Sequence, residues 1–235
     1  MTSSVRPLSF ENHNLTKIKH SNDYHHAKDQ QVVPLIVHEF ARASAEMPIV
    51  FVKNADTGEF QAVALLGLSP NENLFYSSEK WLSDYLPALI SHHPFALMPT
   101  QNDENQLQMV IKEDSNFVST TEGEALFDEA GNETKYLESR KNSLGQYFDN
   151  SHVTQAFTKQ LSDNSLLSQQ NLSLELNGEK IALNGVYLVD EKALNALPDE
   201  DFIALRKKGY LAPIYNHLGS LHQLSRLAKL KAANS

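Results

Sequence analysis

Histidines are the residues of this chain with the widest range of possible chemistry, because imidazole binds transition metals and transfers protons near neutral pH. The chain has ten of them, including the adjacent pairs His25–His26 and His92–His93. Adjacent side chains point to opposite faces of a strand and diverge on a helix, so neither pair is a ready chelate. His217 and His222 miss the i, i+4 spacing of helical zinc signatures. We expect no metal site, although two histidines and a carboxylate could still be assembled from distant residues.

Aromatic residues cluster between Leu74 and Phe95, and they indicate a groove for a ligand or a partner. Tyr and Trp combine an apolar body with a polar tip, and small-molecule sites are apolar pockets with a few polar anchors. Polar residues stand at the start of the same segment. The candidate groove residues are Asn71, Glu72, Asn73, Phe75, Trp81 and Tyr85. The alternative is that these aromatic residues form ordinary core with an amphipathic rim.

Other catalytic patterns are missing from the sequence. The chain has no cysteine, which excludes disulfides, thiolate nucleophiles, and cysteine-ligated zinc or iron–sulfur sites. It has no GxxxxGK phosphate loop, no dinucleotide fingerprint and no G-x-S-x-G elbow. Acidic groups such as Glu122–Glu124 and Asp199–Asp201 are typical of solvated turns and helix starts. The residues therefore indicate no catalytic set and no cofactor, and they favour a non-catalytic protein.

Two hairpins follow from residue type and alternation. β-branched and aromatic residues on both sides of the turn residues Asp56–Gly58 predict a hairpin over about 49–68. Leucines that alternate with polar residues around Asn177–Gly178 predict another over 171–184. Asn-Gly favours a type I′ turn, because both of its central residues take positive φ. Both hairpins indicate a mainly antiparallel sheet.

Helices are predicted where apolar residues recur every three or four positions. One spans about Pro34–Met47, and a mostly helical stretch over 133–167 is expected to break at Gly145 or at Asp149–Ser151. An amphipathic helix over about 213–230 ends the chain. Strands and helices come in mixed runs without regular βαβ order. The predicted fold is therefore α+β, a mixed, mainly antiparallel sheet packed by helices.

Length and composition indicate one domain of ordinary globular type. The chain has 235 residues, of which 41% are hydrophobic and 21% charged, enough to bury a sizeable core. We expect a single domain over 1–235, in which 1–31 form an extended N-terminal arm or a short edge strand. The formal net charge of -9 disfavours phosphate backbones and anionic lipid. Neither a nucleic-acid partner nor docking on a membrane is expected.

The sequence predicts neither export nor membrane insertion. Residues Met1–Pro7 lack the apolar run of a secretory signal. The longest charge-free run, Tyr85–Asn102, contains three prolines and two histidines, which do not suit a bilayer-spanning helix. Together with the absence of cysteine, these features predict a cytoplasmic location.

Three segments, in order along most of the chain, carry a family resemblance. The first is Glu39-Phe40 through Met47-Pro48-Ile49-Val50-Phe51. The second comprises Ala64-Leu65-Leu66-Gly67-Leu68, Glu72-Asn73-Leu74-Phe75, Trp81, Tyr85-Leu86-Pro87-Ala88 and Pro94-Phe95. The third comprises Asp190-Glu191, Leu194, Leu197, His217-Leu218-Gly219-Ser220-Leu221 and Arg226-Leu227. Together they resemble the bacterial SapC family, which is named after a surface-layer-associated gene and is distinct from a peptide-transporter permease of similar name.

The resemblance implies an accessory or interaction protein linked to envelope, surface-layer or nutrient-uptake functions, since family members tend to lie near genes for outer-membrane receptors and flavin-halogenase-like proteins. It implies no reaction and supplies no catalytic residues. We therefore expect a non-catalytic protein with an unidentified protein partner or small ligand. The alternative is a small-molecule-binding protein or an enzyme that uses a pocket near residues 71–95, with a histidine–carboxylate metal site as one form of it.

Overall fold

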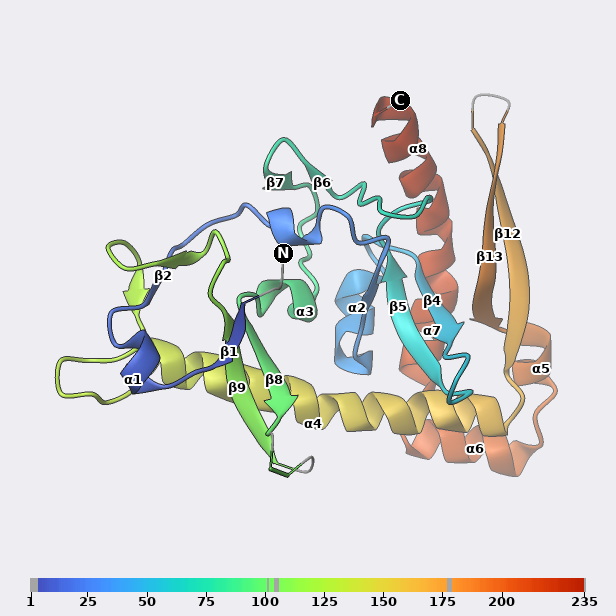
Figure 1. The fold of residues 1–235 in the computed structure, drawn as a ribbon. Helices are drawn as coiled ribbons and strands as arrows, with labels where there is room; N and C mark the ends of the chain where they lie inside the picture. Colours follow the sequence, from blue (N-terminus) through green and yellow to red (C-terminus); the bar gives the residue numbers. More distant parts are fainter. Residues whose placement is uncertain (1–3, 101, 104–105, 177–178, 235) are drawn as a thin grey trace.

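Helices and antiparallel sheets mix along the chain, which ends in a helix (Figure 1). This arrangement confirms the predicted α+β class. The structure is a computed structural model that describes residues 4–100, 102–103, 106–176 and 179–234. The predicted type I′ turn at Asn177–Gly178 lies outside the described residues.

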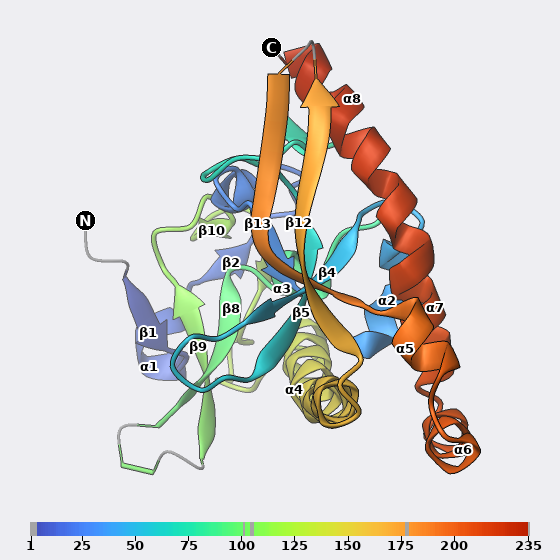
Figure 2. The same ribbon diagram turned by 90° about the vertical axis from the view of Figure 1, so that its right-hand side faces the viewer.

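The largest sheet has five strands in the order β12-β13-β4-β5-β3. Its strands are β3 (Val32–Pro34), β4 (Ile49–Lys53), β5 (Phe60–Leu65), β12 (Leu167–Leu176) and β13 (Glu179–Val189). β4 pairs antiparallel with β5 and β12 with β13, which confirms both predicted hairpins. The second hairpin is longer than predicted and extends beyond the other strands of its sheet, beside α8 (Leu224–Asn234) (Figure 2).

A β-bulge interrupts the regular pairing of the long hairpin. Gln170 pairs with Val186 and Leu172 pairs with Leu183, so Asn184 and Gly185 together oppose one residue of β12. Ile181 and Leu183 precede the bulge at alternate positions of β13, whereas the residues after it, Val186–Val189, are all apolar. Gly185 has a φ of +76°, a conformation that glycine adopts without steric cost.

The N-terminal segment belongs to the other end of the molecule. β1 (Val5–Pro7) is an edge strand of the sheet β1-β9-β8, which also contains β8 (Phe95–Pro99) and β9 (Leu107–Lys112). After α1 (Phe10–His13), β2 (Lys17–Ile18) pairs with β10 (Val118–Ser119) and β11 (Glu124–Ala125), and η1 (His25–Ala27) follows. For residues 1–31 we expected an extended arm or a short edge strand. The described part of this segment contains an edge strand followed by further packed elements, with His13 and Ile18 buried.

One long helix, α4 (Lys135–Asp163), connects two hydrophobic clusters. Its first half contributes Leu137 and Leu144 to the cluster beneath the N-terminal sheets. Its second half contributes Phe157 and Leu161 to the larger cluster beneath the five-stranded sheet. The helix is continuous through both Gly145 and Asp149–Ser151, so the expected break was wrong.

The predicted helix over Pro34–Met47 is much shorter in the structure. Pro34 is the last residue of β3 and does not begin a helix. The next residue is still bonded to the sheet, because the N–H of Leu35 donates to the carbonyl of Ala62 at 3.0 Å. Only η2 (Val37–Glu39) and α2 (Phe40–Ala43) are helical in this segment. The remaining helices of the C-terminal part are α5 (Glu191–Asn195), α6 (Asp199–Lys207), α7 (Leu211–Ser220), η3 (Leu221–Gln223) and α8 (Leu224–Asn234).

Helix α7 is attached to the large sheet by His217, whose ring lies between two strands. β13 pairs directly with β4 at Val186–Val52 and Tyr187–Phe51. Two residues further along this register, the ring separates Val189 from Ile49. The N–H of Val189 donates to Nε2 at 3.1 Å, so Nε2 is unprotonated and Nδ1–H donates to the carbonyl of Ile49 at 2.8 Å.

Ser220, on the same face of α7, binds the other polar group of the same strand residue. Its hydroxyl accepts from the N–H of Ile49 at 2.9 Å and donates to the carbonyl of His217 at 2.6 Å. Both side chains are fully buried. The helix thus provides hydrogen-bond partners for both backbone groups of Ile49, at the point where β13 separates from β4. Buried backbone N–H and C=O groups need such partners.

Gly185 provides a test of the bulge. An alanine Cβ at this position would meet no atom within 4 Å, so the cost of Gly185→Ala is conformational. We expect the free energy of unfolding to fall by about 1–2 kcal/mol in a denaturant titration. Gly219→Ala is the matched control, because that site in α7 is equally open and the same change there should stabilise by up to about 1 kcal/mol. A shift of the same sign in both variants would contradict the bulge geometry.

His217 predicts a pH dependence of stability. Burial is the main cause that lowers its pKa from 6.5 to about 4. The unfolded chain therefore takes up this proton first as the pH falls, so stability is full above pH 6.5 and declines toward pH 4. Between pH 7 and 4 the wild type should lose about 3 kcal/mol more unfolding free energy than His217→Gln. The other histidines of lowered pKa, His26, His92 and His93, remain in both proteins. Parallel pH profiles would refute the role of this ring.

Candidate functional site

The loop after β5 is held together by Glu72, one of the predicted groove residues. Its Oε2 accepts from the N–H of Leu68 at 2.9 Å and of Ser69 at 3.2 Å, and its Oε1 pairs with Lys231 of α8. Gly67 is required here, because a Cβ would lie 2.2 Å from the carbonyl oxygen of Glu72. Glu72 therefore stabilises the loop and attaches it to the C-terminal helix.

The two asparagines of the predicted groove have different roles. Asn73 is buried, its Nδ2 donates to the carbonyl of Ala27 at 2.8 Å, and its Oδ1 accepts from the N–H of Phe75 at 2.9 Å. Asn71 is exposed and has a φ of +58°. Asn73 thus connects the loop to η1, whereas Asn71 lies at the surface of the turn.

Phe75 and Trp81 contact other aromatic rings of the chain. Phe75 is fully buried, and Trp81 stacks on it with ring centroids 6.0 Å apart. Tyr24 meets the indole edge-on at 6.4 Å. Trp81 is half-buried, and its Nε1–H donates to the carbonyl of Tyr85 at 2.8 Å. The short strands β6 (Tyr76–Ser77) and β7 (Lys80–Trp81) position the indole by pairing Tyr76 with Trp81.

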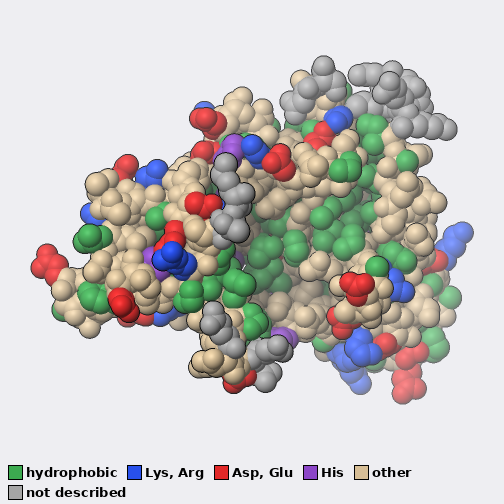
Figure 3. Space-filling view, viewed as in Figure 1, with side chains coloured by type: hydrophobic (Ala, Val, Ile, Leu, Met, Phe, Trp, Pro, Cys, Tyr) green, Lys and Arg blue, Asp and Glu red, His purple; other side chains and the backbone are tan. Residues whose placement is uncertain are grey.

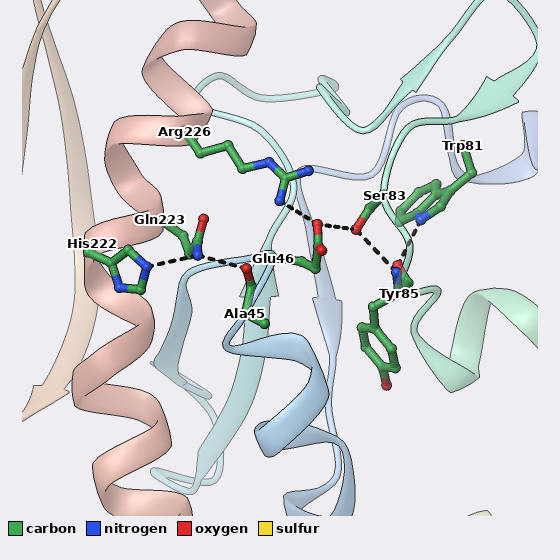
Figure 4. Close-up of polar contacts among 8 residues, drawn as sticks. All are labelled: Ala45, Glu46, Trp81, Ser83, Tyr85, His222, Gln223 and Arg226. Carbon is green, nitrogen blue, oxygen red and sulfur yellow. Dashed lines mark hydrogen bonds and ion pairs between the residues drawn. The ribbon is translucent and has the colours of Figure 1, made fainter.

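The C-terminal helix lies against this segment (Figure 4). Arg226 of α8 pairs with Glu46, which also accepts from the hydroxyl of Ser83 at 3.0 Å. One turn earlier, Nε2 of Gln223 donates to the carbonyl of Ala45 at 2.8 Å. Part of the surface over the aromatic segment is thus covered by the chain itself.

Tyr85 binds a buried carboxylate. Its hydroxyl donates to Glu39, whose Oε1 also accepts from the N–H of Ala88 at 2.8 Å and whose Oε2 accepts from the N–H of Ile36 at 3.0 Å. The guanidinium of Arg42 lies 5.1 Å from the centre of the Tyr85 ring. Burial and then the charge of Glu39 raise the pKa of Tyr85 well above its usual range. Tyr85 is therefore a neutral donor that links η2 to the start of α3 (Ala88–Ser91).

The structure brings all six predicted groove residues into one region. Five pockets at the surface of the described residues are lined by other residues. Phe75, Asn73 and Tyr85 are buried, Trp81 and Glu72 are half-buried, and Asn71 is exposed. A groove at these residues therefore stays a prediction.

A pocket of about 350 Å³ next to this segment contains residues that the sequence did not connect. It is lined by Asp23, His25, His26, His93, Lys112, Asp114, Ser115 and Asn116. One member of each adjacent histidine pair meets here, because the rings of His26 and His93 stack with centroids 3.7 Å apart. The two adjacent histidine pairs were the only sequence signal for this pocket. That signal did not show that His26 and His93 meet.

Ser115 and His93 form a pair that resembles a nucleophile and its base. The hydroxyl oxygen of Ser115 accepts from the N–H of Phe117 at 3.1 Å and lies 2.7 Å from Nε2 of His93. Burial first, and then His26 and Lys112, lower the pKa of His93 to about 3. A base of such low pKa takes a serine proton poorly at neutral pH, because efficient general bases have a pKa near the working pH. The pair is therefore poorly suited to nucleophilic catalysis.

In the described part of the chain, no group of three or more histidines and carboxylates is arranged so that it could hold a metal ion. No helix among the same residues has the length and apolar character needed to cross a bilayer.

Tyr85→Phe tests the buried carboxylate. The change removes one of three hydrogen bonds to Glu39 and should lower the free energy of unfolding by about 1–3 kcal/mol, since a buried acceptor loses its partner. Chemical denaturation of wild type and variant measures this difference. Tyr215→Phe is the control, because Tyr215 is 49% exposed and should change stability by less than about 0.5 kcal/mol. Equal effects of the two changes would show that Glu39 does not depend on Tyr85.

Comparison with known proteins adds one finding. The sequence matches the model of the SapC family over residues 8–227, which include all three segments of the resemblance. Comparisons with curated proteins and with solved structures each find no match.

Proposed function

The chain belongs to the SapC family, and we propose that it is a non-catalytic interaction protein that serves envelope, surface-layer or nutrient-uptake functions from the cytoplasm. Its partner is another protein. The link to these functions rests on the family resemblance, and the cytoplasmic location on the sequence features described above.

An apolar face of the long hairpin carries the proposal. β13 pairs with β4 only at Val186 and Tyr187, so most of the hairpin extends beyond that pairing (Figures 1 and 2). Leu172, Leu174 and Ile181 lie on its inner face and are only partly buried against the core. Figure 3 shows hydrophobic side chains gathered in a hollow over β4 and β5, beside this hairpin. Apolar surface that stays partly exposed in this way is typical of a protein–protein contact.

The use of the chemically versatile side chains supports a non-catalytic role. Glu39, Asn73, His217 and Ser220 are buried and bind backbone groups of distant segments. Ser115 has only a weak base beside it. These residue types, which could serve catalysis elsewhere, hold the fold together here. The net charge of -9 further disfavours a nucleic-acid partner.

A small polar ligand is the second candidate, because the pocket around His26 and His93 adjoins the aromatic segment. Its 350 Å³ volume falls within the usual range for small-molecule sites, about 300–1,000 Å³. Lys112 and Asp114 supply charges of both signs at its wall. This candidate would place ligand binding, rather than a partner protein, beside residues 71–95.

The hairpin offers a matched test of the first candidate. Leu174 and Ile181 are paired on the inner face, whereas Ser173 and Ala182 are paired and exposed on the outer face. We expect Leu174→Asn/Ile181→Asn to abolish capture of a specific protein from an extract of the native bacterium, measured by quantitative mass spectrometry. Ser173→Asn/Ala182→Asn should retain it, and thermal melts check that both variants are folded. Equal capture by both variants, or no protein enriched by the wild type, would refute the proposal.

A further inference from the structure

A largely apolar cleft of about 600 Å³ lies at the other end of the molecule, between the sheet β1-β9-β8 and the first half of α4. Leu97 of β8 is paired with Met109 of β9, and Leu107 stands two residues before Met109. All three line the cleft, because side chains at alternate positions share one face of a sheet. Lys141 and Gly145, four residues apart on α4, form the facing wall.

The cleft remains open because α4 has no side chain at Gly145. A Cβ there would meet no atom within 4 Å, so a larger residue would project into free space. The neighbouring Leu144 packs in the second hydrophobic cluster, as does Leu137 two turns earlier. Glycine inside a helix costs about 1 kcal/mol relative to alanine. The helix therefore gives up stability at the position where it faces the cleft.

The lining of the cleft combines an apolar interior with one ion pair. Leu8, Phe10 and Phe127 add to the apolar wall, with the two aromatic rings in edge contact at 5.5 Å. Lys141 is the one cationic residue of the lining, and it pairs with Glu133. Both charged side chains remain partly exposed, at 41% and 37%. Charge is thus confined to one partly exposed pair, and the rest of the lining is mostly apolar, with Ser9 and Gln108 as its uncharged polar residues.

We propose that this cleft binds an amphiphile with an aliphatic body and a carboxylate head, such as a medium-chain fatty acid. The body lies among Leu97, Leu107 and Met109, and the head pairs with Lys141 in place of Glu133. This volume lies in the usual range for small-molecule sites, about 300–1,000 Å³. The site shares no lining residue with the hairpin, so the inference stands apart from the proposed function.

The position of the two charges favours an anionic head over a cationic one. Lys141 lies within α4 and is fixed by the helix, whereas Glu133 precedes the helix, which begins at Lys135 after the cap Thr134. A displaced Glu133 carboxylate stays near the positive N-terminal end of the helix dipole and remains in water. Replacing Glu133 by a ligand carboxylate in the pair with Lys141 therefore costs little free energy. Displacing Lys141 instead would leave an unpaired cation in the N-terminal half of α4, toward the positive end of the helix dipole.

The test uses the fluorescent fatty acid dansylaminoundecanoate, with dodecanoate and dodecanol as competitors. The wild type should bind the probe, and Gly145→Leu should weaken binding by about tenfold or more by filling the cleft. Gly219→Leu is the control, since Gly219 is also helical and open, and it should bind like the wild type. Lys141→Gln should weaken competition by dodecanoate and leave competition by dodecanol unchanged.

Several outcomes would overturn the inference. A wild type that does not bind the probe, or a Gly145→Leu variant that is folded and binds as well as the wild type, would exclude the cleft as the site. Leu97→Gln repeats the test if melting shows that Gly145→Leu is unfolded. An unchanged affinity of Lys141→Gln for dodecanoate would refute the assignment of the head group.

Discussion

The ring of His217 between Ile49 and Val189 is the contact on which the C-terminal half of the molecule depends. Both ring nitrogens bind backbone groups of different strands, so the imidazole replaces a direct bond of the β-ladder. The ring lies at the Val189 end of β13, opposite the hairpin tip, and it fills the gap where β13 separates from β4. Because Ser220 binds the same strand residue, the end of α7 is fixed. The direction of α8 follows from that attachment.

The three segments that carry the family resemblance meet through contacts of this kind. Glu39 of the first binds Tyr85 and Ala88 of the second. Ile49 of the first binds His217 and Ser220 of the third. Arg226 of the third pairs with Glu46, which lies within the first. The resemblance is therefore concentrated in residues that join distant parts of the chain, which suits a shared architecture better than a shared active site.

The two ends of the molecule present different surfaces, and α4 holds them in one structure. Near the C-terminal half of α4, the hairpin extends beside a hydrophobic hollow (Figure 3). Near its N-terminal half, Gly145 faces the apolar cleft. Both surfaces arise where close packing is incomplete, at a strand that leaves its sheet and at a helix position without a side chain. A protein contact at one end and a small ligand at the other are compatible with this division.

The sequence by itself determined the features that depend on neighbours along the chain. Alternating leucines predicted the long hairpin, β-branched residues the β4–β5 hairpin, and apolar spacing the C-terminal helix, because these signals are local. The tertiary structure decided that Pro34 belongs to a strand, since the N–H of Leu35 binds Ala62 across the sheet. It also decided the roles of the candidate site residues: Tyr85 and Asn73 each bind a partner 46 residues away. Such partners are chosen by the packing of whole elements, and burial then requires each polar group to find one. No local pattern carries that information.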